Sequence, residues 1–176
     1  RRKMEAQAFP IPLEVGVGSD GLQLPSGLIA GQKLNAALRS MTFPVARVSN
    51  FDSLAVPFRA VATDLETGAA VVLADGDLVD AMRASMSAPG VFTPYPVGDR
   101  LLVDGGLVQN VPVEVACELG ADVIIAVDVG ARLADRSELR SVVDLTMQVT
   151  RIMTRSGAAE QLEQLGPDDI LIAPDL

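Results

Sequence analysis

The spacing of apolar residues changes along the first half of the chain, and each change predicts a different element. Across residues 31–41, apolar side chains recur at helical spacing, which predicts an amphipathic helix that Pro44 ends. Two apolar, partly β-branched runs, at 58–63 and 69–73, flank a turn that contains Gly68 and predict a β-hairpin. The first half is therefore expected to alternate helix and strand.

The middle of the chain continues with a helix, a loop and a strand. Asp77 precedes an apolar-periodic segment at 78–85 and is a candidate helix N-cap. Pro and Gly at 89–90 end that helix, and the proline-rich segment 90–100 is predicted to be a loop. A short apolar run at 101–103 predicts a strand that leads into Asp-Gly-Gly.

The last third of the chain repeats helix and strand once more. A helix is predicted at 111–119, followed by a buried parallel strand at 122–127. A long helical segment follows at 137–165, with Gly157 as a candidate break, and a final strand at 169–173. Strands separated by helices are typical of an α/β domain with a largely parallel sheet.

Composition narrows the chemistry that this chain can perform. Its 176 residues suffice for one domain and one core. The absence of histidine excludes a Ser-His-Asp triad, a Cys-His pair and histidine-ligated metals, so no cofactor or metal is expected. The single cysteine, Cys117, lies in an apolar stretch and is interpreted as a small buried hydrophobe. A net charge of −9 argues against nucleic acid as a partner.

Two glycine- and serine-based motifs are weak or absent. The run from Gly16 to Gly21 matches G-x-G-x-x-G by letter, but Pro25 stands where a helix should follow, so a surface turn is the better interpretation. Residues 1–30 as a whole, rich in proline and glycine, predict loop or short extended structure. No serine has the two glycines of a G-x-S-x-G nucleophile elbow, so the chain has no recognisable acyl-transfer nucleophile.

Asp104-Gly105-Gly106 is the strongest chemical signal. A carboxylate at the end of a strand lies where α/β folds place ligand sites, although an Asx turn explains the same pattern. Four other polar residues are interpreted as structural. They are Arg83 with Ser85 and Ser87 at a helix end, and Asp64 at a strand end, where it would pair with Arg59 or Arg83 or bond to its turn.

Five segments in order, across residues 58–130, resemble the patatin-like phospholipase family, and residues 1–57 and 131–176 resemble its bacterial branch less distinctively. They are Ala62-Thr63-Asp64-Leu65 with Thr67-Gly68, Ala81-Met82-Arg83-Ala84-Ser85 with Pro89-Gly90-Val91-Phe92, Val103-Asp104-Gly105-Gly106-Leu107, Asn110-Val111-Pro112-Val113, and Leu119-Gly120 through Val127-Asp128. No single segment is decisive, but five in register are specific. The resemblance implies a three-layer, α/β-hydrolase-related fold with a mostly parallel central sheet, incomplete in this chain.

The resemblance also implies an activity and assigns one residue to it. Members of the family use a Ser–Asp dyad without histidine, and their D-G-[AG] motif falls on Asp104, Gly105 and Gly106. The family's serine elbow and oxyanion loop lie N-terminal to this region, so residues 1–176 are expected to be a partial domain, inactive alone. The expected substrate is a phospholipid or other acyl ester, with contact to a membrane surface and either an oligomer or a missing N-terminal half as partner. The alternative is a non-catalytic α/β binding or regulatory module that retains the fold.

Overall fold

The computed structural model describes residues 16–18, 21–23, 27–29 and 31–174. The helices in these ranges are α1 (Gln32–Thr42), α2 (Leu78–Ser85), α3 (Gly106–Gln109), α4 (Val113–Glu118) and α5 (Val142–Leu162), with short 3-10 turns η1 (Phe43–Val45) and η2 (Phe51–Ser53). The strands are β1 (Gly16–Gly18), β2 (Gly21–Gln23), β3 (Gly27–Ile29), β4 (Ala60–Asp64), β5 (Ala70–Leu73), β6 (Gly90–Phe92), β7 (Tyr95–Val97), β8 (Arg100–Asp104), β9 (Ile125–Val127) and β10 (Ile170–Ile172). The described chain therefore mixes helices with groups of consecutive strands, which is consistent with a partial α/β fold.

The largest described sheet has four strands in the order β5-β4-β8-β7. Gly68 adopts a φ of 71° in the turn between β4 and β5, which confirms the predicted hairpin. All three pairings in this sheet are antiparallel, whereas a mostly parallel sheet was expected. Parallel pairing occurs between β9 and β10 and between β3 and β6. Apolar runs predict that a strand is buried but not its direction, which depends on the connections between strands.

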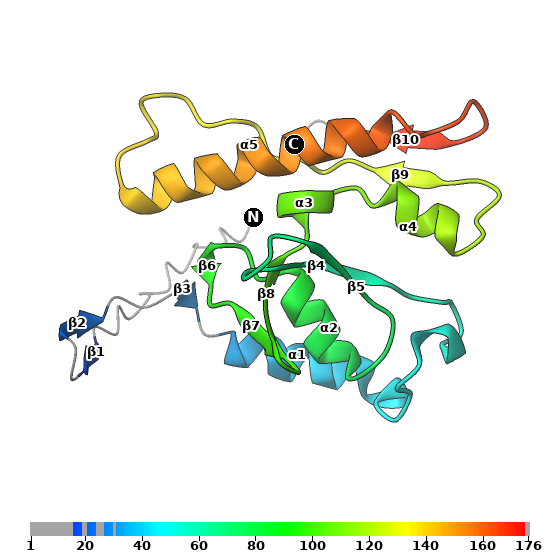
Figure 1. Ribbon diagram of the computed structural model, residues 1–176, viewed down its shortest axis with the longest axis horizontal. Helices are drawn as coiled ribbons and strands as arrows, with labels where there is room; N and C mark the ends of the chain where they lie inside the picture. The colour runs from blue at the N-terminus through cyan, green and yellow to red at the C-terminus, as the bar shows by residue number, and fades with distance from the viewer. Residues whose placement is uncertain (1–15, 19–20, 24–26, 30, 175–176) are drawn as a thin grey trace, which may run out of the picture.

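The helix α2 packs against one face of the sheet, and α1 packs on the far side of that helix (Figure 1). Asp77 caps α2 as predicted, because its side chain accepts hydrogen bonds from the backbone N–H groups of Val79 and Asp80. All five residues of β4 are buried, which fits a central strand. The cluster between α2 and the sheet contains Ala62, Val71, Ala84 and Leu102.

A second layer lies on the other side of the sheet and is formed by α5, α4, β9 and β10 (Figure 1). Its core is small and contains Val111, Val113, Ala126 and Ala158. The predicted strand at 122–127 is confirmed as β9 and is parallel to β10, but it is not buried as expected, since only the middle residue of β9 is covered. Much of the apolar surface of this layer therefore faces outward.

Several local predictions need correction. The segment 90–100 was expected to be a loop but contains β6 and β7, because Pro96 occupies an edge strand where its missing N–H is tolerated. The predicted helix at 111–119 begins later, as α4, after the separate short helix α3. Cys117 is exposed rather than buried.

Gly157 does not break the long helix. α5 runs without interruption from Val142 to Leu162. A Cβ on Gly157 would lie 3.0 Å from the carbonyl oxygen of Val108 in α3. The glycine therefore serves close helix packing rather than helix termination.

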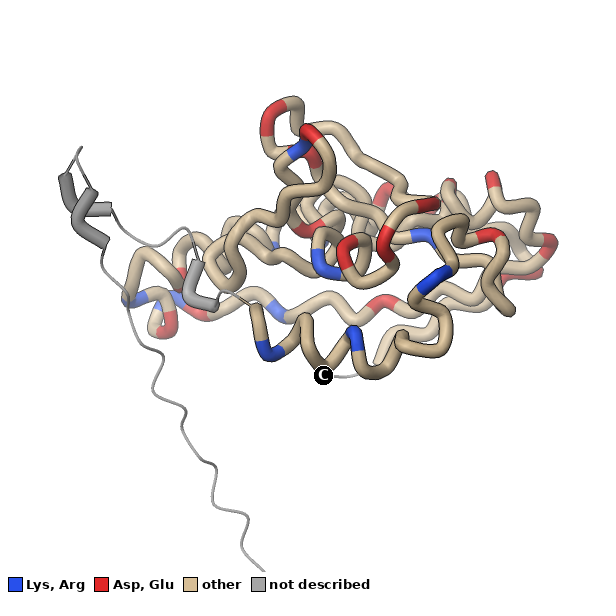
Figure 2. The backbone as a smooth tube through the Cα atoms, turned by 90° about the horizontal axis from the view of Figure 1, so that it is seen from below, with Lys and Arg blue, Asp and Glu red and all other residues tan. Residues whose placement is uncertain are grey.

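The described part of the N-terminal glycine motif forms strands. Within the described part of the motif, Gly16–Gly18 and Gly21–Gln23 pair as antiparallel strands, and the next described element is the strand β3 rather than a helix. The rest of the predicted loop at 1–30 lies largely outside the described residues. Figure 2 shows acidic and basic residues interspersed along the described chain, without a basic stripe. None of the described helices is both long and apolar enough to cross a bilayer.

Candidate active site

Asp104 is the last residue of β8, and its backbone is held from two sides. In the sheet it pairs with Ala62 of β4, and its carbonyl oxygen accepts a hydrogen bond of 2.9 Å from the Thr63 hydroxyl. Its N–H donates to the carbonyl oxygen of Ser87, 3.1 Å away, just beyond the end of α2. These contacts fix the position from which the carboxyl group projects. Thr63 and Ser87 contribute through long-range packing that the sequence pattern does not reveal.

The carboxyl group of Asp104 is half-buried and makes one hydrogen bond with the described residues. Its Oδ1 accepts from the backbone N–H of Gly106 at 2.8 Å, which is the Asx turn that the sequence allowed. Burial raises the pKa of Asp104 above its usual value, against a smaller lowering by the Gly106 bond. Among the described residues no basic side chain forms an ion pair with it, and Arg100 lies 4.0 Å from Asp64 instead. A carboxylate of this kind is a stronger base than an exposed aspartate.

Gly105 is required by the backbone beside it, and Gly106 lies in a tight space between side chains. A Cβ on Gly105 would lie 2.5 Å from the carbonyl carbon of Val61 in β4, and nearer still to its oxygen. A Cβ on Gly106 would lie 3.1 Å from the Asp104 carboxylate and 2.9 Å from the Asn110 side chain. The two glycines thus let the chain turn from β8 into α3 while pressed against β4.

The end of α2 supports this turn. Besides the bond to Asp104, the carbonyl oxygen of Ser85 accepts from the N–H of Gly105 at 3.3 Å. The Ser87 hydroxyl is fully buried and donates to the Arg83 carbonyl oxygen at 2.6 Å. The Ser87 bond matches the structural interpretation of that residue, since helix-end hydroxyls commonly bond to the backbone, whereas Ser85 contributes through its carbonyl oxygen.

Asp64 also has structural partners. Its Oδ1 accepts from the N–H of Glu66 at 2.9 Å, in the hairpin turn. The expected pairing with Arg59 does not form, because Arg59 contacts Asp52 at 2.7 Å. Pairing with Arg83 does not form either.

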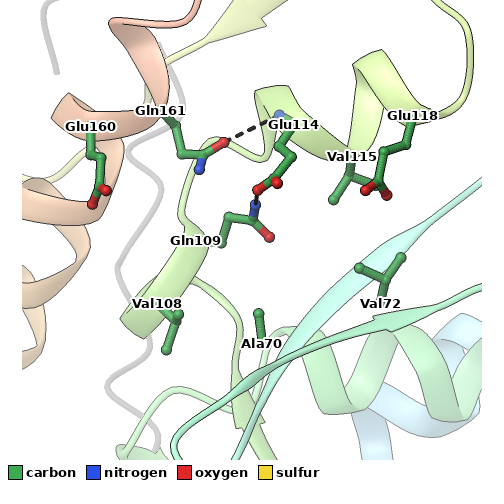
Figure 3. Close-up of a pocket in the computed structure, with 9 residues that line it drawn as sticks. All are labelled: Ala70, Val72, Val108, Gln109, Glu114, Val115, Glu118, Glu160 and Gln161. Carbon is green, nitrogen blue, oxygen red and sulfur yellow. Dashed lines mark hydrogen bonds between the residues drawn. The ribbon is translucent and has the colours of Figure 1, made fainter.

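A cavity of about 390 Å³ lies near this region, between β5, α3, α4 and the end of α5 (Figure 3). Its walls carry Glu114, Glu118 and Glu160, with the side chains of Gln109 and Gln161 bonded to Glu114. A cavity lined by carboxylates does not suit an acyl chain. Asp104 is not among its lining residues, nor among those of a second cavity of about 190 Å³ against α1 and α2.

Comparison with known proteins gives a family for this chain. The family model described as patatin-like phospholipase matches residues 9–117. An NTE family protein of Mycobacterium tuberculosis is 39% identical over 102 residues, covering 58% of this chain and 27% of the relative.

Two mammalian proteins are similar as well. Patatin-like phospholipase domain-containing protein 7 of Mus musculus is 34% identical over 121 residues, covering 68% of this chain and 8% of the relative. Patatin-like phospholipase domain-containing protein 6 of Homo sapiens is 37% identical over 95 residues, covering 53% of this chain and 7% of the relative. The chain thus spans only a small part of these relatives. Since the family model covers well over half of its residues, this chain belongs to the patatin-like phospholipase family.

Proposed function

We propose that residues 1–176 form part of a patatin-like lipid acyl hydrolase domain and supply its catalytic aspartate, Asp104. A serine from outside these residues would complete a Ser–Asp dyad. The substrate would be a phospholipid or another acyl ester presented at a membrane surface. Family members are hydrolases, which supports this class of reaction.

The observation that carries the proposal is the environment of Asp104. Its carboxylate stands at a strand end, is half-buried, has no ion-pair partner among the described residues and has a raised pKa. Each of these properties favours a group that accepts a proton. A carboxylate kept only for stability would more commonly be paired or exposed.

The proposed reaction follows from this geometry. The serine hydroxyl transfers its proton to the Asp104 carboxylate as its oxygen attacks the ester carbonyl carbon, and the alcohol leaves with a proton. Water then attacks the acyl-serine, releasing the fatty acid and restoring the serine. Asp104 needs a fixed backbone for this role, which the bonds to Thr63 and Ser87 provide.

An assay of the isolated chain tests the claim that the nucleophilic serine lies outside residues 1–176. The chain should show no hydrolysis of a p-nitrophenyl ester above background, and a fluorophosphonate probe should label none of its serines, because it holds no activated nucleophile. A denatured sample serves as the background. Turnover that the probe abolishes would show that a serine of this chain, rather than an outside one, is the nucleophile.

A further inference from the structure

The side chain of Arg83 is the most unusual polar group in the fold. It lies in the last turn of α2 and has no solvent exposure. Its Nε, Nη1 and Nη2 atoms make no hydrogen bond, as far as the described residues go. Burial lowers its pKa, yet a guanidinium remains charged in a protein. The fold therefore holds a buried positive charge with its donors unused.

Aromatic rings cover part of this guanidinium. Its central carbon lies 4.6 Å from the ring centroid of Phe92 and 5.4 Å from that of Tyr95. Such contacts stabilise a cation through the ring faces. The rings supply no conventional hydrogen-bond acceptor, so the N–H groups of Arg83 stay without a partner among the described residues.

The N-terminus of α1 lies against the same guanidinium. A Cβ on Gly31, the N-cap of α1, would be 2.6 Å from Nη2 of Arg83, so only glycine allows this approach. Gly31 has a φ of 76°, offers no side-chain cap, and no acidic residue stands in the first turn of α1. The free N–H groups of a helix N-terminus carry partial positive charge.

Two positive features thus meet, and the described residues place no hydrogen-bond acceptor on the guanidinium between them. The nearby carboxylate of Asp80 does not serve Arg83, because its Oδ1 accepts from the Tyr95 hydroxyl at 2.8 Å and from Arg39 at 3.4 Å. The buried Oδ1 of Asn35, one turn along α1, also makes no hydrogen bond, so Arg83 and Asn35 do not satisfy each other. A buried charge in this state is normally compensated by a partner.

From this juxtaposition we infer that Arg83 and the N-terminus of α1 bind a phosphate-type oxyanion. Such an anion accepts hydrogen bonds from a guanidinium fork and from helix N–H groups at once. The ligand is either inorganic phosphate or the phosphodiester of a lipid head group, which present the same oxygens. The inference does not depend on whether Asp104 is catalytic.

Binding of two probes to the 176-residue chain tests this inference. Equilibrium dialysis at constant ionic strength measures radiolabelled inorganic phosphate and, separately, sn-glycero-3-phosphocholine. Arg83→Met removes the donors and keeps the length of the side chain, and Arg132→Met is the matched control, since Arg132 is exposed and pairs with Glu138. We expect Arg83→Met to weaken binding about tenfold or more, and Arg132→Met to leave it unchanged.

The two probes separate the sources of the anion. Arg83-dependent binding of phosphate points to the free ion, and Arg83-dependent binding of the glycerophosphodiester alone points to a lipid head group. Binding of neither probe, or binding that Arg83→Met does not weaken, overturns the inference.

A second measurement covers the case in which Arg83→Met fails to fold. In the unaltered chain, the Nε–Hε resonance of Arg83 should shift saturably with the bound probe, and sodium chloride at equal ionic strength should not reproduce the shift. An unmoved resonance overturns the inference without the variant.

Discussion

Asp104 and Asp128 make the same local hydrogen bond in different surroundings. Each follows apolar strand residues, and each Oδ1 accepts from the N–H two residues later, at 2.8 Å from Gly106 and 2.9 Å from Gly130. Only at Asp104 does the turn lie against a central strand and the end of a helix. Asp128 is therefore a matched control for substitutions at Asp104.

Asp104→Asn should stabilise the chain at neutral pH. Burial raises the folded-state pKa of Asp104, so stability falls as the pH rises from the unfolded-state pKa to this raised value and stays lower above it. Asparagine removes the charge and keeps an oxygen for the Gly106 bond. We expect melting at pH 7 to rise by a few degrees, as roughly 1 kcal/mol corresponds to about 2–4 °C in chains of this size.

The stability gained by Asp104→Asn should depend on pH. The advantage of Asp104→Asn should shrink as the pH falls through the raised pKa and vanish once the carboxyl is protonated in both folded and unfolded chains. Asp128→Asn should show no comparable gain. A lower melting temperature for Asp104→Asn at pH 7 would contradict the assignment of an uncompensated, half-buried carboxylate.

Gly105→Ala should destabilise the chain strongly. The new Cβ would overlap the carbonyl group of Val61 in the rigid strand β4, so the β8–α3 turn would have to move. Overpacking of this kind costs about 1–3 kcal/mol or more. Urea unfolding measures the loss. Gly166→Ala is the control, because its Cβ would meet only ordinary contacts, at 3.6 Å from Asp169, and a similar loss there would mean that the effect is not steric.

At the scale of elements, α2 connects the core to the candidate site, because its C-terminal carbonyl groups hold Asp104 and Gly105. Ser87→Ala removes the buried hydroxyl that bonds to the Arg83 carbonyl oxygen. We expect a loss of about 1 kcal/mol of unfolding free energy, measured in urea. Ser85→Ala should change stability less, because Ser85 holds Gly105 through its carbonyl oxygen. Equal losses would mean that the Ser87 hydroxyl has no special role.

Local signals predicted the elements well where neighbouring residues determine them. The Asp77 cap and the Gly68 turn depend on short-range chemistry and were predicted correctly, and the long helix was predicted as well, although α5 begins at Val142 rather than at 137 and is not broken at Gly157. Strand direction, the strands β6 and β7, and the exposure of Cys117 depend on pairing and packing across the fold, which periodicity does not encode. The position of Asp104 at a strand end was predictable, whereas the supports from Thr63 and Ser87 were not.

At the scale of the whole molecule, α5 carries an apolar stripe that the described residues leave exposed. Val142, Leu145, Val149, Ile152 and Met153 recur at helical spacing and are between 45% and 79% exposed. The strands β9 and β10 add Ile125, Val127, Ile170, Leu171 and Ile172, each close to half exposed or more. An exposed apolar area of this kind favours association.

The isolated chain should therefore self-associate. Light scattering after size exclusion should show oligomers, and replacing Val149 and Ile152 with glutamate should shift them towards monomer. The paired control replaces Glu160 and Glu163, also on α5, with glutamine. A monodisperse monomer that melts cooperatively would mean that the core is self-sufficient and that these surfaces need no partner.

The most direct test of the central claim is the rate of ester hydrolysis when this chain is produced together with the sequence encoded upstream of Arg1. We predict a G-x-S-x-G serine in that sequence and measurable turnover of a phospholipid. Asp104→Asn should lower kcat by about a thousandfold or more, and Asp128→Asn should leave it nearly unchanged. An active enzyme in which Asp104→Asn keeps most of the rate would contradict the role of Asp104 as the base.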